Sequence, residues 1–344
     1  MRVQEVGKYR SAWMGVAILW VVLSHMEVTL PWIHLQSLFK MGYGGVDIFI
    51  FASGFGLYLS LEHDGDFFSF YKRRVLKIMP TYWCFLTLWF LYRFLTGGIP
   101  FSAVIGNIFC IQFYTGNGNE FNWYLSLLWF LYLVATIVKA WTDKVNKRTA
   151  CLTVFILILI ACSYWEAYYH MFTVNRWAVF FVGMLAGRLY NNDVTIKKQW
   201  LFVIDIATVL TAIVLLYLIE NYYWESWRYG MLHFPFVIIA PGVCLMVSQI
   251  LMILPKGLHT FCDGILAFLG RYSLEIFLVH CFVFDVFKDY LVVNGLMEAR
   301  NKNWLLLLIP VVLITILLVF LTRGIMYCFK QCLDAGQHKT EKEA

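Results

Sequence analysis

The chain has 344 residues, of which 61% are hydrophobic and 14% are charged, and its mean hydropathy is +0.70. A soluble domain is far less apolar, so the composition excludes one and indicates a protein that crosses a membrane several times. The formal net charge is +6, but cations at the ends of apolar runs explain it and no RNA-binding motif accompanies them; we therefore expect no nucleic-acid partner.

Ten apolar runs predict an all-α, polytopic transmembrane bundle, because about 20 helical residues cross a hydrocarbon core of roughly 30 Å. The runs lie at 11–29, 44–62, 78–95, 123–140, 150–168, 174–190, 201–219, 230–252, 265–287 and 303–327. An even number of spans places both termini on one side. If that side is cytoplasmic, the inner segments hold 20 of the 27 Lys and Arg residues. The positive-inside rule therefore predicts cytoplasmic termini.

No linker or low-complexity segment divides the chain. We expect a single membrane domain over residues 1–336, embedded in the lipid bilayer of the plasma or inner membrane, followed by a polar and disordered tail at 337–344. The cysteines are scattered through apolar runs without the Cys/His spacing of a zinc site. We therefore expect no metal.

The first span carries Arg10 at its inner mouth and His25 near its outer end. Asp47 enters the second span from the same outer surface, at about the same depth. A carboxylate beside an imidazole fixes its tautomer and stabilises the imidazolium, which indicates that His25 is a general base oriented by Asp47. The alternative is that each side chain only hydrogen-bonds to backbone or to a neighbouring helix.

A basic cluster formed by Lys72, Arg73, Arg74 and Lys77 precedes the third span. Spacings of three and four place Arg73 or Arg74 on the same helical face as Lys77, so that two cations can grip one polyanion. Arg10 is a further phosphate ligand candidate. The alternative is that the cluster only determines topology.

The long outer segment from Thr96 to Asn122 contains no Lys or Arg, and its apolar pattern at 104–113 predicts a short interfacial helix. The aromatic side chain of Trp123 follows it. One interpretation is that this segment forms a rim facing the acceptor, with aromatic side chains that stack on sugars. The alternative is that these side chains form an ordinary aromatic belt at the membrane surface.

Polar residues inside apolar runs are further candidates for lining a cavity, since they are costly in a membrane. We select Ser53, Tyr82, Arg176, Tyr272, Glu275 and His280. Glu275 needs a partner such as Arg176 or a tyrosine hydroxyl. The alternative is that these side chains join helices by hydrogen bonds without a chemical role.

Six segments together resemble the acyltransferase-3 family of bacterial membrane O-acyltransferases. The matching pieces are GVAILWVVLSH (15–25), GGVDIFIFASGFGLYLS (44–60), FYKRRVLKIMPTYW (70–83), NWYLSLLWFLYL (122–133), RWAVFFVGMLAGRLY (176–190) and LGRYSLEIFLVH (269–280). They occur in the family's order and span most of the chain.

The resemblance implies a ten-helix bundle that takes an acyl group from cytoplasmic acyl-CoA and delivers it to a hydroxyl of a surface glycan or another envelope molecule. It also implies that His25 is the catalytic histidine and that Arg73 and Arg74 belong to the basic motif that engages the donor. Lys77 replaces that motif's last arginine, which keeps the charge but loses the bidentate fork.

Two positions depart from the family pattern: Met14 stands where an arginine is usual, and Leu128 where a glutamate often ends its motif. Either Arg10 or another cation substitutes for the missing arginine, or catalysis is altered. Two other functions stay open. One is a transporter that uses intramembrane Asp, Glu and His; the other is an inactive relative that assembles with glycan-export proteins.

Overall fold

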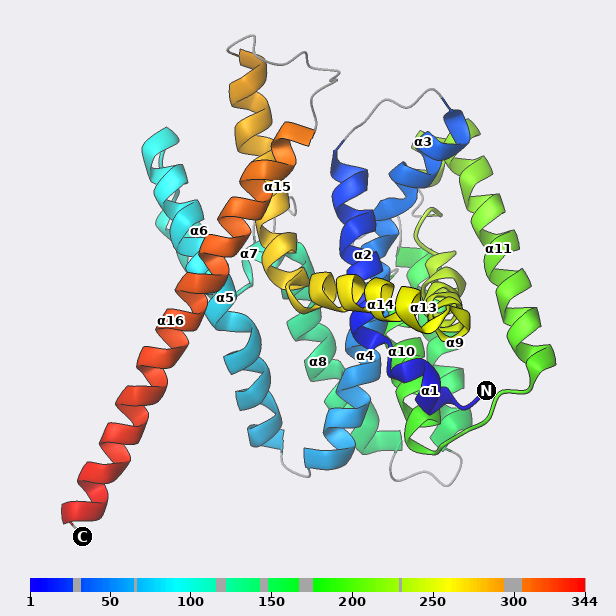
Figure 1. Cartoon of the computed structure of the whole chain (residues 1–344), viewed down its shortest axis with the longest axis horizontal. Helices are drawn as coiled ribbons and strands as arrows, with labels where there is room; N and C mark the ends of the chain where they lie inside the picture. Colours follow the sequence, from blue (N-terminus) through cyan, green and yellow to red (C-terminus); the bar gives the residue numbers. More distant parts are fainter. Residues whose placement is uncertain are drawn as a thin grey trace. The chain divides into compact units, whose positions relative to one another are not determined.

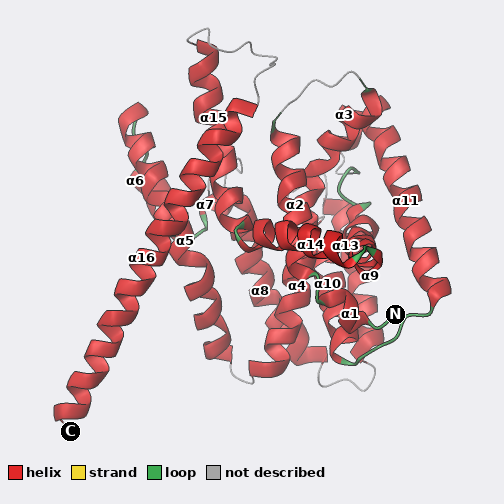
Figure 2. Ribbon diagram, viewed as in Figure 1, coloured by secondary structure: helices red, strands yellow, loops and turns green. Residues whose placement is uncertain are grey.

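The structure is a computed structural model, and it describes residues 1–26, 32–64, 67–115, 122–142, 148–166, 176–228, 231–293 and 305–343. The elements in these ranges are helices, and their only β feature is an isolated bridge between Arg2 and Thr195. Figure 2 shows this all-helical character. The predicted all-α class is confirmed.

The chain divides into two compact units, and helices are labelled in Figure 1. Unit 1 comprises residues 1–67 and 127–273, and unit 2 comprises residues 68–126 and 274–344. Unit 1 contains α1 (Val3–Gly7), α2 (Arg10–His25), α3 (Ile33–Lys40), the 3₁₀ helix η1 (Met41–Gly44), α4 (Gly45–Asp64), most of α8 (Trp123–Thr142), α9 (Arg148–Glu166), α10 (Trp177–Asn191), α11 (Lys198–Asn221), α12 (Tyr223–Arg228), α13 (Phe236–Ile253) and α14 (Lys256–Arg271).

The centre of unit 1 is the contact between α4 and α10, two helices far apart in sequence. Glycines make this close approach possible. A Cβ added at Gly54 would collide with the carbonyl oxygen of Phe180, and one added at Gly183 would collide with that of Phe51. Backbones in such close contact gain dispersion interactions that larger side chains would prevent. Helices associate in this way within lipid, where the hydrophobic effect does not drive them together. Gly54, in the segment SGFG (53–56) of α4, therefore acts in helix packing.

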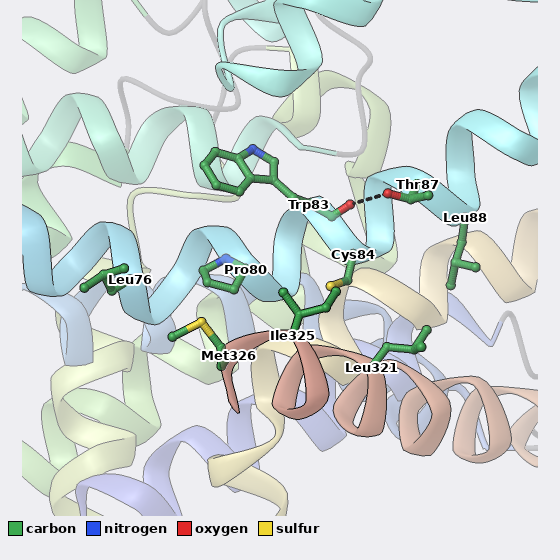
Figure 3. A pocket seen from close by; sticks show the side chains of 9 residues that line it. All are labelled: Leu76, Pro80, Trp83, Cys84, Thr87, Leu88, Leu321, Ile325 and Met326. Carbon is green, nitrogen blue, oxygen red and sulfur yellow. Dashed lines mark hydrogen bonds between the residues drawn. The ribbon is translucent and has the colours of Figure 1, made fainter. Parts of the chain in front are cut away.

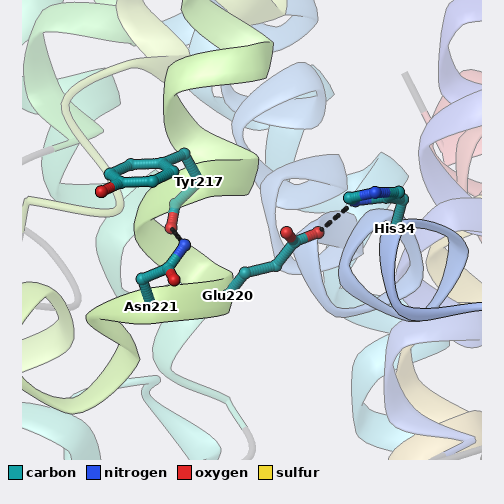
Figure 4. Close-up of polar contacts among 4 residues, drawn as sticks. All are labelled: His34, Tyr217, Glu220 and Asn221. Carbon is teal, nitrogen blue, oxygen red and sulfur yellow. Dashed lines mark hydrogen bonds and ion pairs between the residues drawn. The ribbon is translucent and has the colours of Figure 1, made fainter.

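The second large contact in unit 1 joins α2 to α14 by the same device. A Cβ at Gly15 would meet the carbonyl oxygen of Leu266, and one at Gly270 would meet that of Ser11. At another place in the unit, α3 is tied to the end of α11 by a polar contact: His34 donates from Nδ1 to Glu220 Oε1 at 2.9 Å (Figure 4).

Unit 2 contains α5 (Phe67–Thr96), the short α6 (Phe101–Ile108) and α7 (Gln112–Thr115), the first turn of α8, α15 (Ser273–Val293) and α16 (Leu305–Glu343). Rings of α5 and α15 pack edge to face, since Phe282 contacts both Phe85 and Tyr92 with centroids 6.0 and 5.5 Å apart. The helix expected at 104–113 is present as α6 and α7, which are separated by Cys110 in a left-handed conformation (φ 58°).

Six of the described helices are long and apolar enough to cross a membrane, and the pair α14–α15 supplies a seventh if it counts as one broken span. These findings establish several membrane-spanning helices, whereas the ten-span count and the cytoplasmic termini stay predictions. Helices α2 and α10 overlap predicted spans but have 16 and 15 residues. At 1.5 Å per residue they are only about 24 and 22 Å long.

Three predicted boundaries differ from the structure. Helix α5 begins at Phe67 rather than at residue 78, so it is 30 residues long. The predicted span at 265–287 is broken at Tyr272, between α14 and α15. Helix α16 continues to Glu343, so residues 337–343 extend a helix instead of forming a disordered tail.

Candidate functional site

His25 is the last residue of α2, and its side chain is exposed. Its Nδ1 lies 2.9 Å from the carbonyl oxygen of Val21. A carbonyl oxygen only accepts, so Nδ1 carries the proton and donates it to Val21. The neutral ring then has its lone pair on Nε2, which is the nitrogen that can take a proton from a substrate. This backbone contact fixes the tautomer that a general base needs.

Asp47 does not orient His25, in contrast to the sequence expectation. It lies in the first turn of α4, completely buried, and its Oδ1 accepts a hydrogen bond from Arg176 Nε at 3.2 Å. Arg176, which the sequence offered as a partner for Glu275, immediately precedes α10 and is only 2% exposed. A buried carboxylate needs a cation with fixed donors, and a guanidinium supplies both. The pair joins the helices that the glycines bring together.

Aromatic side chains lie near this ion pair on the neighbouring elements of unit 1. Tyr43, in η1, donates from its hydroxyl to the carbonyl oxygen of Leu232 at 2.7 Å. Its ring also packs edge to face on the buried His233, with centroids 5.3 Å apart. His233 lies just before α13 and is completely buried, and its sequence position did not single it out. A histidine within an aromatic sequence such as LHFPF gives no local signal of its surroundings.

Arg10 begins α2, at the opposite end from His25 and about 22 Å away along the helix axis. Its Nε donates to the carbonyl oxygen of Ala52 at 3.0 Å. A Cβ added at Gly56 would lie only 2.8 Å from the Arg10 guanidinium, so glycine leaves the room that this side chain occupies. Arg10 precedes Met14 by four residues and therefore shares its helical face. A cation thus lies one turn below the position where the family usually has arginine.

Ser53 lies beside Ala52 on α4 and is buried. It therefore belongs to the part of α4 that faces the interior of unit 1.

The basic cluster lies on α5, because this helix begins earlier than the hydropathy indicates. Lys72, Arg73 and Lys77 are exposed, whereas Arg74 is half-buried and stacks over the ring of the buried Phe70, 5.4 Å from its centroid. The helix is about 45 Å long, which exceeds the hydrocarbon core by about ten residues. Its first turns can therefore hold these cations outside the apolar layer.

Tyr82 is completely buried in α5 and lies in a polar cluster of unit 2. Its hydroxyl donates to the carbonyl oxygen of Asn107 at 2.7 Å and accepts from Asn122 Nδ2 at 2.9 Å. The same Nδ2 lies 3.0 Å from Asn107 Oδ1. Burial also raises the pKa of the neighbouring Cys110 thiol to about 12, although a hydrogen bond with Tyr82 opposes that shift. Trp123, half-buried, begins α8 directly after this cluster.

The two asparagines escaped the sequence analysis. Asn122 precedes an apolar run, where an asparagine usually signals only a helix start, and Asn107 lies in a segment interpreted as interfacial. The hydrogen bonds tie α6 and the start of α8 to α5. The segment TGNGNEFN lies mostly outside the described residues.

His280 and Glu275 lie on α15, and Tyr272 immediately precedes that helix. His280 is completely buried; its Nδ1 donates to the carbonyl oxygen of Ile276 at 3.0 Å, and Cys281 Sγ lies 3.3 Å from its Nε2. A thiol can donate to that nitrogen. Glu275 is half-buried in the first helical turn, where a carboxylate is stabilised by the helix dipole. The ring of Tyr272 contacts Phe268 at 5.0 Å between centroids.

A polar cluster at the C-terminal end of α4 was also missed. Arg188 donates from Nη1 to the Tyr58 hydroxyl at 3.1 Å and from Nε to Thr149 Oγ1 at 3.0 Å. Next to it, Lys139 forms an ion pair with Glu62 at 3.1 Å. From the sequence, both cations were expected only to bias the topology of the chain. The structure uses them to fasten α8, α9 and α10 to α4.

The comparisons with known proteins agree with the resemblance of the motifs. A family model described as an acyltransferase domain, that of the acyltransferase-3 family, matches residues 14–324. No curated protein and no solved structure matches the chain. The family model covers nearly the whole chain, including the histidine at the end of α2, the basic cluster of α5 and the buried ion pair. The protein is thus a membrane acyltransferase by family, and the chain belongs to the acyltransferase-3 family.

Proposed function

We propose that this protein is an O-acyltransferase of the plasma or inner membrane that moves an acyl group, in the simplest case acetyl, from cytoplasmic acyl-CoA to a hydroxyl of a cell-surface or exported glycan. The family membership supports acyl transfer. The observation that carries the proposed chemistry is the 2.9 Å distance between His25 Nδ1 and the carbonyl oxygen of Val21. Because a carbonyl oxygen accepts, this contact puts the proton of a neutral ring on Nδ1 and its lone pair on Nε2.

His25 acts as a general base in the proposed reaction. Its Nε2 takes the proton of the acceptor hydroxyl as the hydroxyl oxygen attacks the thioester carbonyl. A carbon–oxygen bond forms, the carbon–sulfur bond breaks, and the proton on Nε2 passes to the departing CoA sulfur. The exposed position of His25 at a helix end leaves its ring accessible to a substrate. The imidazole returns to its starting state after each transfer.

Donor recognition is assigned to the cations of α5. Arg73 and Arg74 match the family's basic motif, and Lys77 lies one turn further along the helix. Arginine forks bind phosphate oxygens in pairs, whereas the lysine contributes a point charge. Met14 stands where the family usually has an arginine, and Arg10 is the candidate to supply that positive charge. Ser53, Trp123, Tyr272, Glu275 and His280 stay candidates for lining a cavity.

The ion pair of Asp47 with Arg176 has a supporting role in this proposal. It fixes α10 against α4, and the same glycine-rich stretch of α4 receives the Arg10 side chain. Asp47 is therefore a positioning residue rather than a proton carrier.

Mass spectrometry of surface glycans from cells with and without this chain tests the proposal. We expect a set of glycan ions that is heavier by one acyl group only when the chain is present, and the mass difference identifies the group and its recipient together. The His25→Ala variant, expressed at the same level, should give the spectrum of cells that lack the chain. Identical spectra from all cells would contradict the proposal and favour an assembly role beside other glycan-export proteins.

A further inference from the structure

Unit 2 has a groove between α5 and α16 that the proposed reaction does not use. It has a volume of about 430 Å³, within the range of small-molecule pockets. Figure 3 shows its lining: one stripe of α5 faces one stripe of α16, with Leu76 near Met326 at one end and Leu88 near Leu321 at the other. The full lining is Leu76, Pro80, Trp83, Cys84, Thr87, Leu88, Leu321, Ile325 and Met326.

The groove offers almost no polar partner to an occupant. Its one hydroxyl, on Thr87, donates to the carbonyl oxygen of Trp83 within α5 at 2.9 Å. The pantetheine arm of CoA carries two amide groups, and burying these without hydrogen bonds would be costly. A hydrocarbon chain has no such requirement. The lining therefore favours an acyl chain over the donor's arm.

The groove opens to the outside of unit 2 along its length. Trp83 and Ile325, from opposite walls, are 44% and 54% exposed. Both α5 and α16 are candidate membrane spans, so the medium beside these side chains is lipid. A chain can therefore enter sideways from the bilayer.

One end of the groove carries positive charge. Lys72 and Arg73 precede Leu76 by four and three residues, so they continue the same face of α5 by one turn. Both are exposed. By contrast, Arg74 lies on another face and stacks on Phe70. An apolar groove that ends at exposed cations matches an occupant with an apolar chain and a negatively charged head group.

We propose that the groove binds one anionic phospholipid of the bilayer, with an acyl chain along the α5–α16 stripe and the phosphate beside Lys72. The proposal does not depend on the acyl-transfer reaction, because it uses the groove and Lys72. A basic residue near the membrane surface attracts anionic lipid, and its loss should lower the preference for such lipid about fivefold.

Native mass spectrometry of the full-length protein tests the site. The protein is incubated with equal amounts of phosphatidylglycerol and phosphatidylcholine that have identical chains, and the retained lipids are counted. We expect retention of phosphatidylglycerol in preference to phosphatidylcholine. Lys72→Gln should reduce the preference about fivefold. Its control is Lys198→Gln, which removes an exposed cation at the start of another span and should change nothing.

The part of the site that binds the lipid's acyl chain is tested by filling the groove with larger side chains. Thr87→Trp should abolish the preferential retention of phosphatidylglycerol. Ile325→Trp, which fills the groove from the opposite wall, should have the same effect. The matched control is Thr153→Trp, because Thr153 is also an exposed threonine bonded to the carbonyl oxygen four residues earlier. Equal retention of the two lipids, or unchanged retention in both groove variants, would overturn the proposal. Displacement of the lipid by acyl-CoA would overturn it as well, because the groove would then belong to the donor.

Discussion

The buried ion pair of unit 1 gives the sharpest prediction about stability. Asp47 and Arg176 are 0% and 2% exposed, and 3.2 Å separates their nearest atoms. At that distance and an effective dielectric constant of about 20, the attraction is about 5 kcal/mol. Removing one partner leaves the other charge buried and uncompensated, which costs about 3–5 kcal/mol. We therefore expect Asp47→Leu and Arg176→Met each to lower the free energy of unfolding by that amount.

The double variant separates a charge effect from a packing effect. With both charges gone, nothing is left uncompensated, so Asp47→Leu/Arg176→Met should be more stable than either single variant. The assay is unfolding of the purified protein in mixed micelles, followed by tryptophan fluorescence, with all four proteins in one double-mutant cycle. A coupling energy of about 2 kcal/mol or more is expected. Additive losses would refute the assignment of these residues as a coupled pair.

Three further outcomes follow from the contacts described above. Gly183→Val should lower the thermal unfolding temperature, because its side chain would collide with the α4 backbone, whereas Gly257→Val, which meets nothing within 4 Å, should leave that temperature almost unchanged. Tyr82→Phe should cost about 1–3 kcal/mol of stability, because it deprives buried asparagine groups of a partner; an unchanged unfolding midpoint would contradict the cluster. In single-cysteine variants, Cys328 should react with maleimide and Cys110 should not, since burial raises the pKa of the Cys110 thiol to about 12; equal labelling rates would disprove its burial.

The sequence predicted the fold class and the positions of most helices, because a helix satisfies its own backbone hydrogen bonds and is therefore the form that a long apolar run takes in lipid. It failed where hydropathy and helix ends do not coincide. Lys72, Arg73, Arg74 and Lys77 are charged, so they ended the predicted span, but lysine and arginine are good helix formers and α5 continues through them. Conversely, the apolar run at 265–287 continues through Tyr272, where the helix breaks.

The site was predicted in part. The expected pairing of His25 with Asp47 depended on their similar depth in the membrane, and depth is only one coordinate of a helical residue. The direction in which a side chain leaves the helix is the other, and it depends on how α4 packs. Asp47 turns instead to Arg176, which is 129 positions away in the chain, and no local spacing could have indicated that partner. The tautomer of His25 depends on a backbone carbonyl, which sequence patterns do not reveal.

Acyl transfer by purified protein in proteoliposomes tests the role of His25 most directly. Isotopically labelled acetyl-CoA is supplied on one side of the membrane, and label in the hydroxyl-bearing glycan acceptor is measured over time. We expect transfer by the wild type and loss of at least about 100-fold in rate for His25→Ala, the usual contribution of a general base. Transfer by His25→Ala at the wild-type rate would contradict the assignment of His25 as the catalytic base.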